Sequence, residues 1–339
     1  MRPTTKDLAQ AAGVSLATVD RVLNDRPNVS SRSREKVLQA ITVIGFVRNL
    51  SAVNLVKNRI YTFRFVFPTV GGEYLQELID QAKAARVDMK SDVTDIECIQ
   101  LSMQDPHDVA NYLANIEPGK TDGIAIMAPA SPPVRDAIAR LDERGVKVVQ
   151  FLSGQEKLDS LDFVGADNIA AGATAGSIFA KFLNKTRGKI MVIADTMHSL
   201  NNIQRRLGFD RVINECPALT ALPTLETHGD KARAKRIISR QLEHDSDIVA
   251  VYVISSEART PIEQLANGVA LESLTIVVHE RTPFTERALL DNQIDAVVAQ
   301  NPGHAVRSTL RILRARSDNR EIVAAQEKIR IEILLKDNL

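Results

Sequence analysis

Tryptophan is absent from the 339-residue chain, cysteine occurs only at Cys98 and Cys216, and the six histidines are scattered singly. This pattern offers no metal-ligand spacing and no redox pair, so we expect neither a metal site nor a disulfide. No apolar run approaches the roughly 20 residues that span a bilayer. The first residues also lack the apolar segment of a secretory signal, which favours a cytoplasmic protein.

Motifs of the common enzyme classes are missing as well. There is no G-x-S-x-G elbow, no P-loop and no G-x-G-x-x-G following a strand. We therefore expect no catalytic residues and no cofactor.

Charge is distributed unevenly along the chain. The first 60 residues carry a net charge of +6, whereas the whole chain carries +1. A basic N-terminal segment before an acidic remainder suggests a polyanionic partner for that segment alone. A solvated charged surface remains the alternative.

Three short helices are predicted within residues 1–45. The first follows Thr4 or Thr5 and ends at Gly13, the second is capped by Ser15, and the third starts at Ser30. The apolar residues that these helices carry are Leu8, Ala9, Ala12, Val19, Val22, Leu23, Val37, Leu38, Ile41 and Ile44.

From residue 60 onward, β-rich apolar runs alternate with helical stretches. The predicted strands lie in 62–68, 95–100, 121–129, 146–154, 162–167, 189–196, 248–256, 274–280 and 294–300. The predicted helices lie in 74–85, 107–116, 134–145, 170–183 and near 204–214. Such alternation, in two series, predicts an α/β body of two doubly wound parallel-sheet lobes. Ligands of such sheets bind beyond the carboxyl ends of the strands, so the expected site is a cleft between the lobes.

The segment TKDLAQAAGVSLATVDRVLN, from Thr5 to Asn24, closely resembles the helix-turn-helix of the LacI/GalR repressor family. The resemblance implies a DNA-binding head in which Leu16, Ala17 and Arg21 face base edges in the major groove. The full set of implied DNA contacts in the head is Thr5, Ser15, Leu16, Ala17, Thr18, Arg21, Asn24 and Ser30. Ser15 and Thr18 are expected at phosphates. Any amphipathic three-helix head would show the same apolar spacing, which is the competing interpretation.

Residues 46–59 resemble the hinge of the same family, where Asn49, Ala52 and Leu55 occupy matching positions. The resemblance implies that Leu55 is an apolar wedge for the minor groove, which bends the duplex. An ordinary linker residue is the alternative. The hinge departs from the family at Arg48, which replaces a proline, and at Val53, which replaces an arginine.

Asp20 is a further departure, because many relatives carry serine there and a carboxylate near phosphates should be repelled. Asp20 either reorients Arg21 through a salt bridge or selects against some bases.

Residues 60–339 resemble the periplasmic-binding-protein-like effector domain of the same family, in its ribose-type branch. The effector contacts that this resemblance implies are Tyr74, Ser153, Asp167, Arg205, Glu280 and Gln300. In this interpretation Arg205 grips hydroxyls or a carboxylate, Glu280 faces sugar hydroxyls, and Tyr74 stacks on a sugar ring.

Each of these side chains also has a structural alternative. Arg205 could lie on a helix surface, Asp167 could cap the helix that follows, Glu280 could be solvated, and Tyr74 could be core. The Asn-Asp pair of many relatives is replaced by Ser255-Ser256-Glu257. This replacement argues against transferring a particular sugar to the chain.

The sequence thus predicts a helix-turn-helix head at 1–45, a hinge at 46–59 and a two-lobed effector and dimerisation body at 60–339. The implied function is a sequence-specific regulator, most often a repressor in this family, that binds double-stranded operator DNA as a homodimer. Its effector would be a sugar or polyol. The alternative function is that of a solute-binding protein that senses a sugar without regulating DNA.

Overall fold

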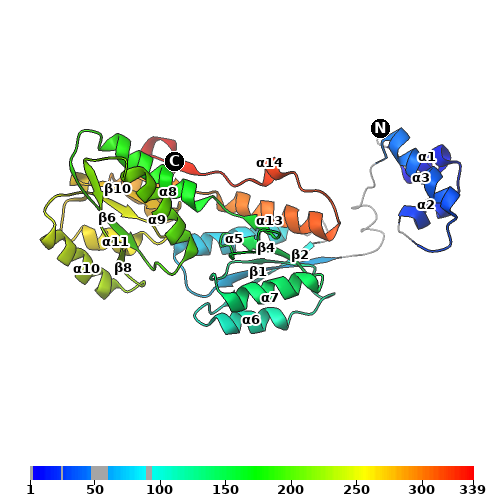
Figure 1. Ribbon diagram of the computed structural model, residues 1–339, viewed down its shortest axis with the longest axis horizontal. Helices are drawn as coiled ribbons and strands as arrows, with labels where there is room; N and C mark the ends of the chain where they lie inside the picture. Colours follow the sequence, from blue (N-terminus) through cyan, green and yellow to red (C-terminus); the bar gives the residue numbers. More distant parts are fainter. Residues whose placement is uncertain (1–2, 24–25, 47–59, 89–93) are drawn as a thin grey trace. The chain divides into compact units, whose positions relative to one another are not determined.

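The computed structural model describes residues 3–23, 26–46, 60–88 and 94–339 of the chain (Figure 1). The chain separates into two compact units, Met1–Arg59 and Ile60–Leu339. The described residues of the first unit are all-α and those of the second are α/β, as the sequence patterns predict.

The head contains α1 (Thr5–Ala12), α2 (Leu16–Leu23) and α3 (Ser31–Ile44). Local side chains determine where α1 and α3 begin. The Thr4 hydroxyl accepts from the Asp7 backbone N–H while the Asp7 carboxylate accepts from the Thr4 backbone N–H, and the Ser30 hydroxyl caps α3. Gly13 and Gly45 end α1 and α3 in the left-handed conformation, with φ of 61° and 60°. The predicted starts of both helices and the predicted end of α1 at Gly13 are confirmed.

A small core closes the head. Its buried apolar residues are Leu8, Ala12, Val19, Val22, Val37, Ala40 and Phe46. Leu38, in contrast, is 53% exposed. Successive residues of a helix are rotated by about 100°, so α3 cannot turn both Val37 and Leu38 inward.

The second unit consists of two lobes. Lobe 1 has a five-stranded parallel sheet of order β2-β1-β3-β4-β5. Its strands are β1 (Tyr61–Pro68), β2 (Thr94–Leu101), β3 (Gly123–Ile126), β4 (Lys147–Phe151) and β5 (Asp162–Val164). One face packs on α5 (Glu73–Asp88) and α13 (Pro302–Ser317), and the other on α6 (Pro106–Ala114) and α7 (Pro132–Glu143).

Lobe 2 has a sheet of order β12-β11-β10-β9-β6-β7, in which β12 is antiparallel and β8 also pairs with β6. Its strands are β6 (Gly188–Ala194), β7 (Leu219–Ala221), β8 (Leu225–Glu226), β9 (Ile248–Val253), β10 (Thr275–His279), β11 (Ala296–Ala299) and β12 (Glu332–Leu334). Its helices are α8 (Asn168–Phe182), α9 (Leu200–Ile213), α10 (Lys231–His244), α11 (Arg259–Leu265) and α12 (Pro283–Leu290). The helices α8 and α9 cover one face, and α10, α11 and α12 the other.

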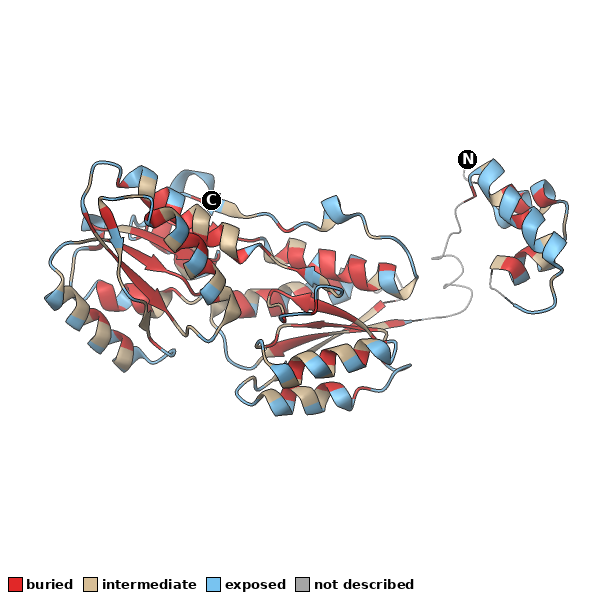
Figure 2. Cartoon of the chain, viewed as in Figure 1, coloured by how far each residue is buried: buried red, intermediate tan, exposed pale blue. Residues whose placement is uncertain are grey.

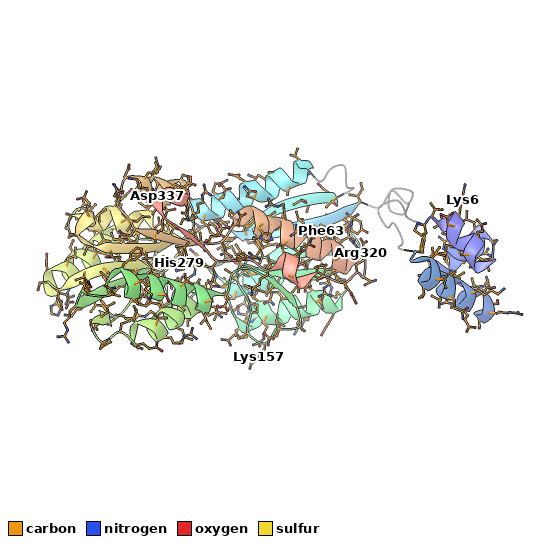
Figure 3. The ribbon with its side chains drawn as sticks, turned by 90° about the horizontal axis from the view of Figure 1, so that it is seen from above. Lys6, Phe63, Lys157, His279, Arg320 and Asp337 are labelled. Atoms are coloured by element: carbon orange, nitrogen blue, oxygen red, sulfur yellow. The ribbon has the colours of Figure 1, made fainter. Side chains whose placement is uncertain are left out.

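Burial follows this layering. In Figure 2 the buried residues follow the sheets and the inner faces of the helices. Figure 3 labels Phe63 in β1 and His279 in β10, which belong to the cores of lobe 1 and lobe 2. Among the described helices, none combines the length and apolarity that a membrane span requires.

The chain passes between the lobes more than once. It crosses at 164–168, crosses back at 299–302, and returns through a segment containing α14 (Ala324–Glu327) to β12. Strand β5 of lobe 1 and strand β11 of lobe 2 end at two of these crossings.

Candidate functional site

The exposed face of α2 carries the residues expected to read DNA. Leu16, Ala17 and Arg21 are all exposed, while Val19 and Val22 on the opposite face are buried. The helix therefore presents a mixed apolar and guanidinium surface, anchored by its inner side to α1 and α3. Thr5, in the first turn of α1, is exposed as well.

Two serine hydroxyls of the head also cap the helices that follow them. The Ser15 Oγ accepts from the Thr18 backbone N–H at 3.1 Å and lies 2.9 Å from the Thr18 Oγ1. The Ser15 side chain therefore caps the N-terminus of α2. Ser30 caps α3 in the same manner. Both serines remain exposed, so their hydroxyls stay accessible.

Asp20 forms an ion pair with Arg26, in which Nη1 lies 3.2 Å from Oδ2. Arg26, which follows α2 in the sequence, is thus one partner of Asp20. Four predicted DNA contacts, Asn24, Asn49, Ala52 and Leu55, lie outside the described residues.

In the body, Arg205 is buried and each part of its guanidinium is engaged. Its Nε donates to Asn168 Oδ1 at 2.8 Å, its Nη1 to the Ile254 carbonyl at 3.0 Å, and its Nη2 to Glu280 Oε1 at 2.7 Å. Arg205 is 5% exposed. The alternative of a surface arginine does not apply.

Glu280 directly follows β10 and is 2% exposed. Besides Arg205, it accepts from the Gln300 side-chain amide at 3.2 Å and from the Gln300 backbone N–H at 3.3 Å. Its backbone is left-handed, with φ of 66°, which is unfavourable for a residue with a Cβ. Strain of this kind is concentrated at functional sites. The carboxylate is thus held in place, and the solvated alternative does not apply.

Tyr74 of lobe 1 lies near Arg205 and Glu280 of lobe 2. It is buried in the second position of α5, and its hydroxyl has no hydrogen-bond partner within the described chain. Burial raises the pKa of Tyr74 well above its ordinary value, and the negative charge of Glu280 adds to this effect. Tyr74 therefore adds a neutral hydroxyl near Glu280 and Gln300.

Close packing of α8 against α9 positions Arg205. A Cβ added at Gly172 would lie 1.8 Å from the Arg205 carbonyl oxygen, and one at Gly208 would lie 1.9 Å from the Ile169 carbonyl oxygen. Only glycine permits such an approach of two backbones. The contact brings Asn168, at the start of α8, within reach of the Arg205 side chain.

His279 lies one residue before Glu280 and is 1% exposed. Its Nε2 is 2.7 Å from the hydroxyl of Tyr252, which is also buried. Burial lowers the pKa of His279 well below its usual value, and the nearby Arg205 charge lowers it further. His279 is therefore uncharged at neutral pH.

Four of the six predicted effector contacts thus come together, namely Tyr74, Arg205, Glu280 and Gln300. The other two have separate roles. The Ser153 hydroxyl donates to the Ala128 carbonyl at 2.9 Å, and the exposed Asp167 caps α8 by accepting from the Ala170 N–H at 3.0 Å.

Sequence reasoning missed Asn168, which belongs to this site, and two polar residues that bond across the lobes, Glu73 and Asn201. Glu73 bonds to Arg259 of lobe 2, and Asn201 of lobe 2 donates to the Leu152 carbonyl of lobe 1 at 3.0 Å. Because the partners of these residues lie far away in sequence, no local sequence pattern indicates these contacts.

We call Tyr74, Asn168, Arg205, Glu280 and Gln300 the interlobe cluster. It joins a cation, an anion, two amides and a phenol, with no net charge. Such groups donate and accept hydrogen bonds and are suited to holding a polar ligand. Within the described ranges, no three His, Cys, Asp or Glu side chains gather as metal ligands.

Comparison with known proteins matches each unit to a family. Residues 4–49 match the bacterial regulatory proteins of the lacI family, and residues 63–321 match the periplasmic binding protein domain. The HTH-type transcriptional regulator RegA of Clostridium saccharobutylicum is 29% identical over 217 residues, which cover 63% of this chain and 62% of RegA. The chain thus spans a little under two thirds of that relative's length.

Solved structures share the fold of the body. One is a solute-binding protein of an ABC transporter from Burkholderia graminis C4D1M in complex with D-arabinose. It has a TM-score of 0.70 and 19% identity, over 82% of this chain and 96% of that one. Another is a solute-binding protein from Bacillus halodurans C-125 with bound myo-inositol, with a TM-score of 0.70 and 17% identity, over 82% of this chain and 96% of that one.

Proposed function

Because the chain belongs to the lacI family of bacterial regulatory proteins and carries a periplasmic binding protein domain, we propose that it regulates transcription in response to a small molecule. In this proposal the head binds operator DNA in the cytoplasm. A sugar or polyol binds at the interlobe cluster and changes operator affinity, and the chain has no catalytic role.

The exposed face of α2 supports the DNA half of the proposal. Arg21 can donate two hydrogen bonds to a guanine, while Leu16 and Ala17 offer apolar contacts to thymine methyl groups. The net charge of +6 on residues 1–60 attracts the duplex. Leu55, placed by its resemblance to the family hinge, would enter the minor groove. Two heads of a homodimer would read a near-palindromic site.

The interlobe cluster is the observation that carries the ligand half. Its residues are buried and polar, and they come from both lobes and from the crossings between them. A ligand that bonds to Tyr74 of lobe 1 and to Glu280 of lobe 2 favours the closed arrangement of the lobes. The similar folds that hold D-arabinose and myo-inositol support a sugar or polyol as the ligand.

The mechanism follows from linkage. Closure of the lobes changes the spacing or order of the two hinges of a dimer, and thereby the affinity for operator DNA. The same coupling requires operator DNA to change effector affinity by an equal factor. Release of repression by the sugar is the sign that we propose.

The test is selection of DNA from a random library by the purified full chain, with and without a pool of sugars and polyols. We expect a palindrome to be enriched in one condition and depleted in the other. Enrichment that ignores the pool would contradict effector control. Failure to enrich any sequence would contradict DNA regulation and leave the solute-binding alternative.

The hinge assignment has its own test. Leu55→Ala should weaken binding to the selected palindrome, because the wedge that unstacks a base step is lost. Effector binding should stay as it is, since Leu55 lies outside the body. Equal operator affinity of the variant would contradict the wedge.

A further inference from the structure

We propose that the interlobe cluster accepts only uncharged polyhydroxyl ligands, and that Glu280 is the residue that excludes charged ones. This inference rests on the proposed effector function. It narrows the ligand to neutral sugars and polyols, as opposed to sugar acids, sugar phosphates and amino sugars.

The first reason for this selectivity is that the charges of Arg205 and Glu280 already balance inside the cluster. The Arg205 guanidinium is already paired with Glu280 at 2.7 Å, and their side chains are 6% and 2% exposed. An anionic ligand at Arg205 would have to displace Glu280 and leave its carboxylate buried without a cation. Removing one partner of a buried ion pair is strongly unfavourable, because the remaining charge is neither paired nor hydrated. Sugar acids and phosphate esters are excluded on this ground.

Cationic ligands meet the opposite difficulty. The Glu280 carboxylate already accepts from Arg205 and twice from Gln300. An ammonium placed beside it would also lie close to the Arg205 guanidinium, and like charges in a buried site repel strongly. The neighbouring His279 and Tyr74 are uncharged and cannot compensate.

The unsatisfied hydroxyl of Tyr74 provides the second, independent reason. Several buried polar atoms of the described chain lack a hydrogen-bond partner, and the Tyr74 hydroxyl is the one that belongs to the interlobe cluster, where a ligand hydroxyl could bond to it. A ligand hydroxyl can accept from Tyr74 and donate to Glu280 or to the Gln300 carbonyl at the same time. A carboxylate or phosphate oxygen can accept but cannot donate. At this position of the cluster an alcohol oxygen therefore fits better than a carboxylate or phosphate oxygen.

The experiment uses the full chain and ligand series that differ only in charge. One series is D-glucose, D-glucuronate, D-glucosamine and D-glucose 6-phosphate, and analogous series are built on arabinose, ribose, galactose and myo-inositol. Thermal shift finds the skeleton that binds, and titration calorimetry measures the affinity of each member. We expect the neutral member of the binding series to bind at least about tenfold more tightly than its charged counterparts.

Glu280→Gln tests the assigned residue. Glutamine keeps the shape and can still accept from Arg205, but it leaves the guanidinium without a counter-charge. We expect the ratio of neutral to anionic affinity to fall by about tenfold or more in this variant. The matched control is Glu97→Gln, which removes a carboxylate from the Arg64–Glu97 pair inside lobe 1 and should preserve the ratio.

Each outcome of these measurements supports or contradicts a named part of the proposal. Equal binding of a sugar acid and its neutral counterpart by the unaltered chain overturns the charge selection while the effector function stands. Absence of binding across all series and charges overturns the effector function together with the selection. An unchanged ratio in Glu280→Gln removes the assignment to Glu280. Should that variant fail to fold, the ratio in the unaltered chain still decides the charge selection.

Discussion

Glu73, the first residue of α5 in lobe 1, pairs with Arg259, the first residue of α11 in lobe 2. The other oxygen of the same carboxylate accepts from the Phe284 backbone N–H at 2.9 Å, and the Arg259 guanidinium lies 5.3 Å from the centre of the Phe284 ring. One side chain of lobe 1 therefore engages two helices of lobe 2. Tyr74 is the next residue of α5.

We expect Glu73→Gln to weaken effector binding by about tenfold. A charge-assisted hydrogen bond contributes about 1.5 kcal/mol, which corresponds to that factor when it favours the binding-competent arrangement. Titration calorimetry with the ligand found by thermal shift measures the effect. Glu97→Gln serves as control, because its ion pair with Arg64 stays within lobe 1. Unaltered affinity in Glu73→Gln would show that the pair does not stabilise closure.

Tyr74→Phe should separate ligand binding from stability. The change removes a buried hydroxyl that has no partner, so the free energy of unfolding should stay the same or rise, by up to about 1 kcal/mol. Effector affinity should fall by about tenfold, because the ligand loses a hydrogen bond. Urea unfolding and calorimetry provide the two measurements. A variant that is less stable and binds normally would identify Tyr74 as a core residue.

The Arg205–Glu280 pair should behave as a unit in unfolding experiments. Arg205→Met leaves the Glu280 carboxylate buried without its cation and should cost about 3–5 kcal/mol of stability. The double change Arg205→Met with Glu280→Met removes both charges and should cost less than Arg205→Met alone. Additive losses in a double-mutant cycle would argue that the two residues act independently.

Much of the head could be predicted from its sequence because its signals are local. Thr4 and Asp7 lie three residues apart, and the glycines that end α1 and α3 stand directly after those helices. The exposure of Leu38 could not be predicted from local signals. Its exposure depends on which side of α3 meets the other helices, and apolar character alone does not determine this.

The two-lobed body could be predicted in outline because the patterns of its strands and helices are also local. Alternating strand and helix patterns identify the lobes, but the return of α13 to lobe 1 follows only from tertiary packing. Arg205 and Glu280 are 75 residues apart in sequence, and Asn168 lies 37 residues before Arg205. Resemblance named Arg205 and Glu280 one by one, whereas their ion pair follows only from the packing of α9 beside the end of β10.

Arg21→Ala tests the reading face of α2. Loss of a bidentate contact to guanine should cost about 1–3 kcal/mol of operator affinity and relax the preference at one base pair. The control is Arg32→Ala on α3, where an exposed arginine of equal charge is removed. It should weaken binding to all sequences alike, as a loss of general attraction does. A uniform loss in Arg21→Ala would assign that residue to the phosphates.

His279 should make stability depend on pH in a defined window. Its pKa in the folded chain lies well below the ordinary value of 6.5, chiefly because of burial. Well above pH 6.5 neither state binds the proton, so the stability contribution is complete. As the pH falls below 6.5, the unfolded chain takes up a proton that the folded chain refuses, and stability decreases. Between pH 7.5 and 5.5 the loss from this residue should be about 1 kcal/mol.

Urea unfolding of the unaltered chain and of His279→Gln at these two pH values isolates that contribution. Glutamine can form a hydrogen bond with the Tyr252 hydroxyl as donor or acceptor, but it does not titrate. The variant should therefore lose about 1 kcal/mol less than the unaltered chain over the same interval. Identical losses would mean that His279 becomes protonated inside the fold. The Arg205 charge beside it opposes that outcome, because a second buried cation would have to share the single carboxylate of Glu280.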